Sequence, residues 1–135
     1  MQKFLQFEFV PRSVDLALFV LRLWLGLSMA TLHGWGKLSG LFNGTTTFPD
    51  ILRIGSLPAL LLAIFAEFFC SVFLILGLWT RLAALMLVVT MCVAFFMAHG
   101  AKLSGQASGE LAFVYLAGYV VLLLAGAGKF SVDKK

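Results

Sequence analysis

The sequence predicts an all-α protein, an integral membrane four-helix bundle with a parallel two-helix internal repeat, in a single domain over residues 1–135. Of these residues 61% are hydrophobic and 12% are charged, whereas soluble domains are about half apolar and a quarter charged. Four apolar stretches, at residues 14–33, 57–79, 82–98 and 110–127, approach the ~20 residues that cross a bilayer as a helix. The spans leave little room for a soluble domain, so we expect any chemistry in the bilayer, at its surface or on a partner.

A repeated motif divides the chain into two halves. His-Gly followed by Lys-Leu-Ser-Gly occurs at residues 33–40 and again at residues 99–105, after the first and the third apolar stretch. The span that follows each copy carries a glutamate, Glu67 in one half and Glu110 in the other. Two halves in the same orientation form a parallel repeat, of the kind found in some transport folds.

The segments that flank the spans have their own predicted structure. Residues 1–13 alternate aromatic and polar side chains, as expected of a leader that lies on the inner membrane surface. Residues 48–55 predict a short interfacial helix that begins at Pro49, ends at Gly55 and covers the bundle with its apolar side. Residues 77–81 predict a tight turn on the inner side.

Basic residues predict the orientation of the chain in the membrane. Four spans place both termini on one side of the bilayer, together with Lys3, Arg12, Arg81, Lys129, Lys134 and Lys135. The opposite loops hold Lys37, Arg53 and Lys102. Because basic loops are retained in the cytoplasm, both termini are predicted to be cytoplasmic and both copies of the motif to lie at the outer face. The net charge of +4 forms no single patch, which argues against a nucleic-acid partner.

Two charged residues, Arg22 and Glu67, lie well inside the predicted spans and away from their ends. A charge in a bilayer costs about 2.5–3.5 kcal/mol on insertion scales and therefore faces the bundle interior. At ~1.5 Å per residue, Arg22 lies about 12 Å and Glu67 about 18 Å from the inner face, so we expect the two side chains to pair. The pair has two interpretations, a structural ion pair that fixes the helix register, or a site for protons or a ligand.

The best candidate site lies at the outer ends of the first and third spans. His33 and His99 are brought to one end of the bundle, with Lys37 and Glu110 nearby. Imidazoles can transfer protons, bind metals or hydrogen-bond a quinone carbonyl, and a carboxylate can fix their tautomer. The structural alternative is that the histidines only satisfy helix carbonyls, with the following glycines as left-handed caps.

Other chemistry is less favoured by the pattern. A haem held between His33 and His99, or a metal at the same residues with Glu110, lacks supporting motifs elsewhere, so no metal ligands are assigned. Cys70 and Cys92 have similar estimated depths on adjacent helices, but without a Cys-x-x-Cys motif the sequence does not decide whether they interact.

Six short motifs follow one another over almost the whole chain. They are His33-Gly34 with Lys37-Leu38, Ala66-Glu67-Phe68, Leu76-Gly77-Leu78 with Thr80-Arg81, His99-Gly100, Gly109-Glu110-Leu111, and Gly-Ala-Gly-Lys-Phe-Ser-Val-Asp at residues 126–133. In this order they resemble the DoxX family, with Lys129 where the family pattern has arginine. The resemblance implies a four-helix protein of the bacterial inner membrane, often labelled an oxidoreductase and named for a subunit of a quinol oxidase or a thiosulfate:quinone oxidoreductase.

The leading hypothesis is a membrane-embedded subunit of a quinone- or sulfur-linked redox system, whose electrons come from a partner protein. The candidate catalytic residues are His33, His99, Glu67 and Arg22. The candidate cofactor-binding residues are His33, Lys37, His99 and Glu110, with quinone as the favoured cofactor. A small-molecule or ion carrier and a structural scaffold for partner proteins are the alternatives, and a homo-oligomer is compatible with each.

Overall fold

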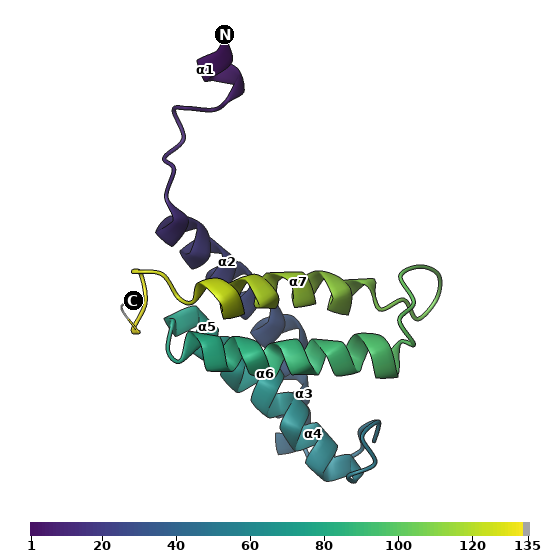
Figure 1. Cartoon of the computed structure of the whole chain (residues 1–135). Coiled ribbons are helices and arrows are strands. Elements are labelled where there is room, and N and C mark those ends of the chain that lie inside the picture. The colour runs from purple at the N-terminus through teal and green to yellow at the C-terminus, as the bar shows by residue number, and fades with distance from the viewer. Residues whose placement is uncertain (134–135) are drawn as a thin grey trace.

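The computed structural model describes residues 1–133, which contain helices and no strand (Figure 1). Lys134 and Lys135, counted above among the basic residues, lie outside this range. The elements in chain order are α1 (Gln2–Leu5), α2 (Val14–Met29), η1 (Ala30–Gly34), α3 (Trp35–Phe42), α4 (Ser56–Ile64), η2 (Phe65–Cys70), α5 (Ser71–Leu76), α6 (Thr80–Cys92), η3 (Val93–Ala98) and α7 (Glu110–Ala125). The η segments are short stretches of π-helix that continue the α-helices around them.

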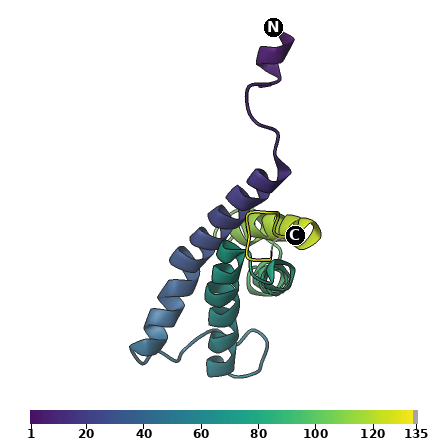
Figure 2. The ribbon, with the colours of Figure 1, turned by 90° about the vertical axis from the view of Figure 1, so that its left-hand side faces the viewer.

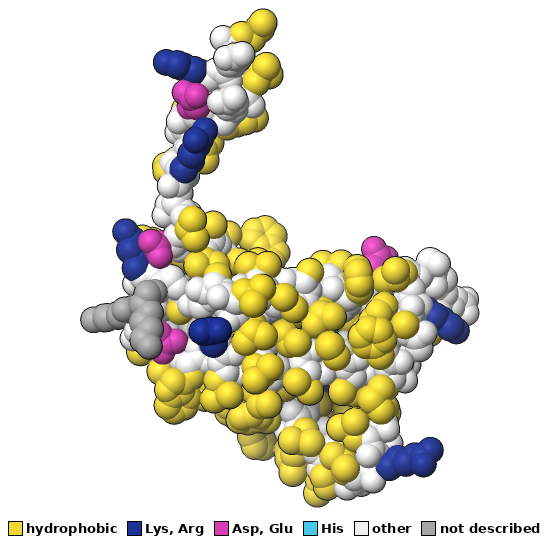
Figure 3. Space-filling view, viewed as in Figure 1, with side chains coloured by type: hydrophobic (Ala, Val, Ile, Leu, Met, Phe, Trp, Pro, Cys, Tyr) yellow, Lys and Arg dark blue, Asp and Glu magenta, His cyan; other side chains and the backbone are white. Residues whose placement is uncertain are grey.

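The helices have the length and composition of membrane spans. Three continuous helices are apolar and long enough to cross a bilayer, Val14–Phe42, Ser56–Leu76 and Thr80–Ala98. The fourth, α7, is apolar over 16 residues and packs along α6. Hydrophobic side chains cover the middle of the helical body, and charged side chains gather at its two ends (Figure 3). The chain is therefore a helical membrane protein.

The helices form two antiparallel pairs. The helix that contains α2 and α3 packs against the one that contains α4 and α5, and α6 packs against α7 (Figure 1). Figure 2 shows α6 and α7 nearly end-on, whereas the other pair runs across the picture. The two pairs therefore cross. Small residues let the helices approach closely: a Cβ on Gly26 would lie 3.0 Å from the carbonyl oxygen of Ser71. The bundle therefore consists of two antiparallel helix pairs that cross each other.

The bundle has two distinct ends. The hairpin end comprises residues 77–79 and 126–133, which are joined because the Val132 N–H donates to the Leu76 carbonyl at 3.1 Å. The opposite ends of the two pairs carry the loops 43–55 and 99–109, which lie apart because the pairs cross (Figure 1) and are together called the loop end. Residues 1–13 extend away from the hairpin end as an exposed arm (Figures 1 and 2).

The first span corrects one predicted boundary. The helix was expected to end at His33, but it continues to Phe42, and Gly34 has right-handed helical angles of φ −70° and ψ −44°. A Cβ on Gly34 would lie 2.8 Å from the backbone carbonyl of Glu67. The glycine is therefore used for a close helix contact and not for a left-handed cap. Gly100, in the second copy of the motif, does have a left-handed φ of +58°.

The predicted interfacial helix at residues 48–55 is also wrong. This segment forms turns, in which the Asp50 carboxylate accepts hydrogen bonds from the backbone N–H groups of Ile54 and Gly55, both at 2.8 Å. The Ser56 hydroxyl accepts another from the Phe48 N–H at 2.7 Å. Side-chain acceptors of this kind compete with the backbone ladder of a short helix. The segment nevertheless covers part of the bundle, because Phe48, Pro49, Ile51 and Leu52 line a cavity between the helices.

Candidate functional site

A cavity of about 450 Å³ lies at the loop end, between α3, the α4–η2 helix and the α6–η3 helix. Most of its wall is apolar: Phe48, Pro49, Ile51, Leu52, Ala59, Leu62, Ala63, Phe65, Ala66, Met86, Val89, Val93, Ala94 and Ala98, with Thr90 as a small polar member. The Thr90 hydroxyl donates to the Met86 carbonyl at 2.8 Å, so its proton is already engaged within the helix. The wall therefore suits a largely apolar molecule.

One ion pair supplies the charge in this cavity. The Lys37 ammonium lies 2.8 Å from Glu67 Oε2, and both residues line the cavity. The side chain of Glu67 is 12% exposed and that of Lys37 is 25% exposed. Lys37 is placed here because the first helix continues past Gly34, which keeps the lysine on the helix surface that faces η2. Removed from bulk water, the pair can hydrogen-bond or exchange a proton with a bound ligand.

The expected ion pair between Arg22 and Glu67 does not form. Arg22 is fully buried nearer the hairpin end, where its guanidinium donates to the carbonyls of Leu74 at 2.9 Å and Ile75 at 3.2 Å, and to that of Phe130. Glu67 lies two turns before Leu74 on the neighbouring helix. The estimate from depth failed because it ignored the relative positions of the crossing helices, and Lys37 was assigned to a loop.

Arg22 instead joins three parts of the hairpin end. Its carbonyl partners come from α5 and from residues 126–133, and its guanidinium also lies over the Phe19 ring at 5.5 Å. Nearby, the Asp133 carboxylate accepts hydrogen bonds from the N–H groups of Trp79 and Thr80 at 2.9 and 3.0 Å, which caps the start of α6. The Lys129 N–H donates to Asp15 at 3.0 Å. Charge at this end is therefore engaged in holding the chain together.

His33 lies beside the aromatic side chains of α7. Its ring makes an edge contact with Tyr115 at a centroid distance of 6.0 Å, and Tyr115 stacks on Tyr119 at 5.8 Å. The Tyr115 hydroxyl lies near the Ser28 side chain. Tyr119 is fully buried and lies within electrostatic range of Glu67. The ring contact of His33 therefore connects η1 with α7.

His99 and Glu110 lie at the other copy of the motif. His99 follows η3, and its Nδ1 lies 3.0 Å from the Ala107 carbonyl, so the ring braces the loop that it begins. Glu110 begins α7 and is exposed. No contact recorded for residues 1–133 joins His99 to His33, and neither His99 nor Glu110 lines the cavity. The structure thus brings together Lys37 and Glu67 but separates the two halves of the predicted site.

Within residues 1–133, each of the three long helices contains one π-helical stretch. Glu67 lies within η2, His33 within η1, and His99 directly follows η3. A π-turn inserts an extra residue into the helix and is frequently found at functional sites. The rotation that it produces is one reason why an ideal helical wheel does not place these side chains correctly.

Cys70 and Cys92 are free thiols, Cys70 buried and Cys92 partly buried. Within residues 1–133 no group of three or more His, Cys, Asp or Glu side chains is arranged to hold a metal. The cavity residues that the sequence did not indicate are those of the loop and of α6, such as Ile51 and Met86. Their apolar character is shared by most of the chain, so no signal distinguished them.

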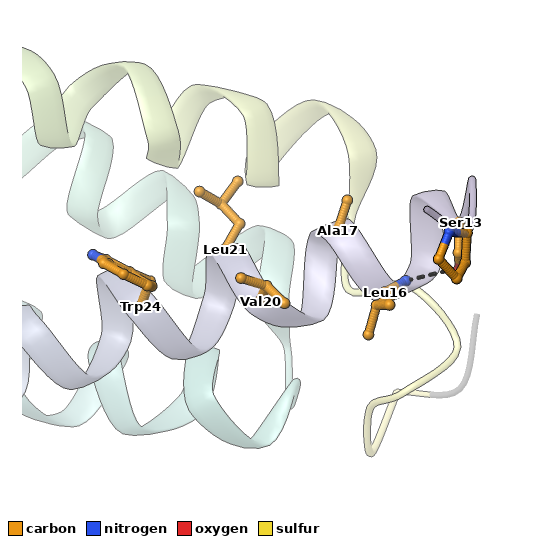
Figure 4. Close-up of a pocket in the computed structure, with 7 residues that line it drawn as sticks. Ser13, Leu16, Ala17, Val20, Leu21 and Trp24 are labelled. Carbon is orange, nitrogen blue, oxygen red and sulfur yellow. Dashed lines mark hydrogen bonds between the residues drawn. The ribbon is translucent and has the colours of Figure 1, made fainter. Parts of the chain in front are cut away.

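A second hollow lies along the outer side of α2 (Figure 4). It is lined by Pro11, Ser13, Leu16, Ala17, Val20, Leu21 and Trp24. The Ser13 hydroxyl accepts a hydrogen bond from the Leu16 N–H at 3.1 Å and starts the helix. None of the lining residues carries a charge. This hollow has the character of a lipid-facing helix surface.

The comparisons with known proteins agree with the membrane fold. The DoxX family model matches residues 17–100, more than half of the chain. An uncharacterized protein of Haemophilus influenzae (strain ATCC 51907 / DSM 11121 / KW20 / Rd) is 39% identical over 83 residues, which cover 58% of this chain and 62% of that protein. The match thus spans less than two thirds of that relative's length. No solved structure matches the chain significantly.

Proposed function

Because this chain belongs to the DoxX family, we propose that it is a membrane-embedded subunit of a redox system and that it binds a quinone in the cavity at its loop end. The observation that carries the proposal is the Lys37–Glu67 ion pair in the wall of an otherwise apolar cavity. A quinone combines a ring bearing two carbonyl oxygens with an apolar tail. The ion pair suits the first part, and the wall suits the second.

The chemistry assigns different tasks to the two charged residues. The Lys37 ammonium donates a hydrogen bond to a quinone carbonyl, and the Glu67 carboxyl group transfers protons. Reduction of a quinone to a quinol consumes two electrons and two protons. A redox centre on a partner protein supplies the electrons, and water supplies the protons through Glu67.

The remaining predicted site residues have supporting tasks in this proposal. His33 positions the α7 tyrosines through its contact with Tyr115. Arg22 fixes the hairpin end through its three carbonyl partners. His99 braces the loop that ends at Glu110. Arg22 and His33 therefore act through the helix that carries Lys37, and His99 acts through the loop between η3 and α7.

Quinone binding is measured directly on the purified full-length protein. Titration with ubiquinone-1 in nanodiscs should quench the fluorescence of wild type, because Trp35 packs on Phe68 next to Glu67 with ring centroids 6.2 Å apart. In Lys37→Met and Glu67→Gln the Kd should rise at least about tenfold, as expected for loss of a charge-assisted hydrogen bond.

Matched controls separate a site effect from a general one. Lys102→Met alters the equivalent lysine of the second motif copy, which is exposed, and Glu8→Gln alters an exposed residue of the arm. Both variants should bind as wild type does. The proposed site would be contradicted if ubiquinone-1 gave no saturable quenching in wild type. It would also be contradicted if Lys37→Met and Lys102→Met raised the Kd equally.

We also propose that the termini face the cytoplasm of a bacterial inner membrane. Lys3, Arg12, Arg81 and Lys129 lie on the arm or at the hairpin end, which agrees with cytoplasmic retention of basic segments. Alkaline phosphatase fused after residue 133 should be inactive, and the same enzyme inserted after Gly105 should be active. The reverse pattern would refute this orientation.

A further inference from the structure

Two of the three core hydroxyl groups without a protein partner in the described part of the chain lie toward Glu67, and the third, that of Thr80, lies at the start of α6. Tyr119 and Ser71 are both fully buried, and neither hydroxyl has a hydrogen-bond partner within residues 1–133. The same is true of Nε of the fully buried Arg22. Buried polar groups in native proteins are hydrogen-bonded to protein or to ordered water, so these three atoms indicate a place where water is held.

Arg22 and Ser71 lie along the contact between α2 and the helix that contains η2 and α5, and Tyr119 approaches it from α7. This contact is called the seam below. Ser71 lies one turn after Glu67, and its backbone oxygen would lie 3.0 Å from a Cβ on Gly26. Arg22 lies one turn before Gly26 and reaches the carbonyls of Leu74 and Ile75. The order from the loop end to the hairpin end is therefore Glu67, Ser71, Arg22 along the contact between α2 and α5.

Tyr119 closes this seam from the side of α7. The adjacent Gly118 packs on Leu25, which places Tyr119 close to the level of Gly26. Tyr119 is within electrostatic range of Glu67, and its ring stacks on Tyr115. The seam is therefore enclosed by three helices and leads to the carboxyl group that lines the cavity.

We propose that water fills this seam and that the hydroxyls of Tyr119 and Ser71 pass protons to Glu67 during quinone reduction. The inference rests on the proposed function for the use of those protons. Each hydroxyl accepts a proton from one neighbour and releases its own to the next, so neither changes its charge overall. Arg22 keeps its proton throughout, and bulk water on the hairpin side supplies each proton that the chain passes on.

The water is tested by radiolytic hydroxyl-radical labelling of the full-length protein in nanodiscs, read by mass spectrometry. Tyr119 should be modified although it is fully buried, because bound water generates radicals next to it. Met91, which is 4% exposed in the core of α6, should react slowly despite its oxidisable sulfur. Absence of modification at Tyr119 at a dose that modifies Met91 would overturn the proposal.

The proton role is tested on the variant Tyr119→Phe, with Tyr115→Phe as the matched control. Dithionite supplies two electrons to ubiquinone-1 bound in nanodiscs, and bulk water supplies two protons through the seam. The rate of quinol formation should fall about tenfold in Tyr119→Phe while the Kd for ubiquinone-1 stays unchanged, and Tyr115→Phe should leave both unaltered. Equal rates in Tyr119→Phe and wild type would overturn the role of this hydroxyl.

The two tests distinguish this inference from the proposed function. Labelling at Tyr119 needs no quinone, so failure of quinone binding leaves the result on water intact. Conversely, normal quinone binding without labelling at Tyr119 refutes the seam alone.

Discussion

The two copies of the repeated motif adopt different structures although six of their residues are the same. In the first copy, His33 and Gly34 continue a helix that carries Lys37 to the cavity, where the lysine pairs with Glu67 at 2.8 Å. In the second, the helix ends, Gly100 and Ala101 have left-handed φ angles of +58° and +59°, and Lys102 is exposed. The repeated letters therefore do not specify one local structure.

Two differences between the copies explain this result. Histidine and lysine are four residues apart in the first copy and three apart in the second, a difference of one residue that rotates the lysine by about 100° around a continuous helix. In addition, Gly34 lies against the backbone of η2, whereas a Cβ on Gly100 would have no neighbour within 4 Å. A packed neighbour keeps the first copy helical, and its absence lets the second copy turn.

The largest effect should come from changing the spacing of the first copy. Deletion of Gly36 gives it the spacing of the second copy and rotates the lysine by about 100° around the helix, so Glu67 loses its partner. We expect a loss of about 3 kcal/mol in the free energy of unfolding, measured by titration with sodium dodecyl sulfate in mixed micelles. Insertion of one glycine after Ala101 should cost less than about 0.5 kcal/mol, because the extra residue enters an exposed loop.

The lysine itself should account for much of that loss. Lys37→Met leaves the Glu67 carboxylate without its counter-ion in an apolar wall, and we expect about 2 kcal/mol of destabilisation in the same assay. The double variant Lys37→Met with Glu67→Met should recover most of it, because no charge then remains buried. A double variant less stable than Lys37→Met would show that the pair stabilises the fold by itself.

The glycines should differ by a smaller margin. Gly34→Ala places a methyl group 2.8 Å from the Glu67 carbonyl and forces the two helices apart, at a cost of about 2 kcal/mol. Gly100→Ala strains only a left-handed residue in open space, at about 1 kcal/mol. Thermal unfolding of the two variants side by side checks the order, and an equal effect would show that helix contact is not what distinguishes Gly34.

The smallest effect should be the local one at His99. His99→Ala removes the contact with the Ala107 carbonyl and should loosen residues 99–109, with about 1 kcal/mol or less of global destabilisation. Faster hydrogen exchange confined to this loop, measured by mass spectrometry, is the expected result. His33→Ala should instead raise exchange in α7 around Tyr115.

Much of the fold followed from the pattern of apolar residues. The second, third and fourth spans were predicted within three residues at each end, and the left-handed φ of Gly100 agrees with the structural alternative for its motif. Hydrophobic length is a local property, so it can be read without knowledge of the partners. The end of the first span was predicted at His33, too early in the chain. A His-Gly dipeptide can end a helix, but it can also lie within a helix where the glycine packs against the backbone of a neighbouring helix.

The candidate site followed less well. Glu67 and Lys37 were both marked, but the glutamate was paired with Arg22, and the cavity wall contributed by residues 48–52 and by α6 had no signature of its own. Pairing depends on how far crossing helices slide past one another and on the rotation that each π-turn adds. The periodicity of residues along one helix reports neither the offset between two crossing helices nor the rotation at a π-turn.

The sequence by itself determined that this is a helical membrane protein of the DoxX family, because bilayer thickness and the cost of burying charge act on each segment separately. Tertiary structure alone decided which cation meets Glu67, and which of two nearly identical motifs remains helical. Both outcomes depend on contacts between segments more than 25 residues apart, such as Gly34 against the backbone of Glu67. The first copy stays helical because Gly34 packs against the neighbouring helix, where only glycine leaves enough room for its backbone.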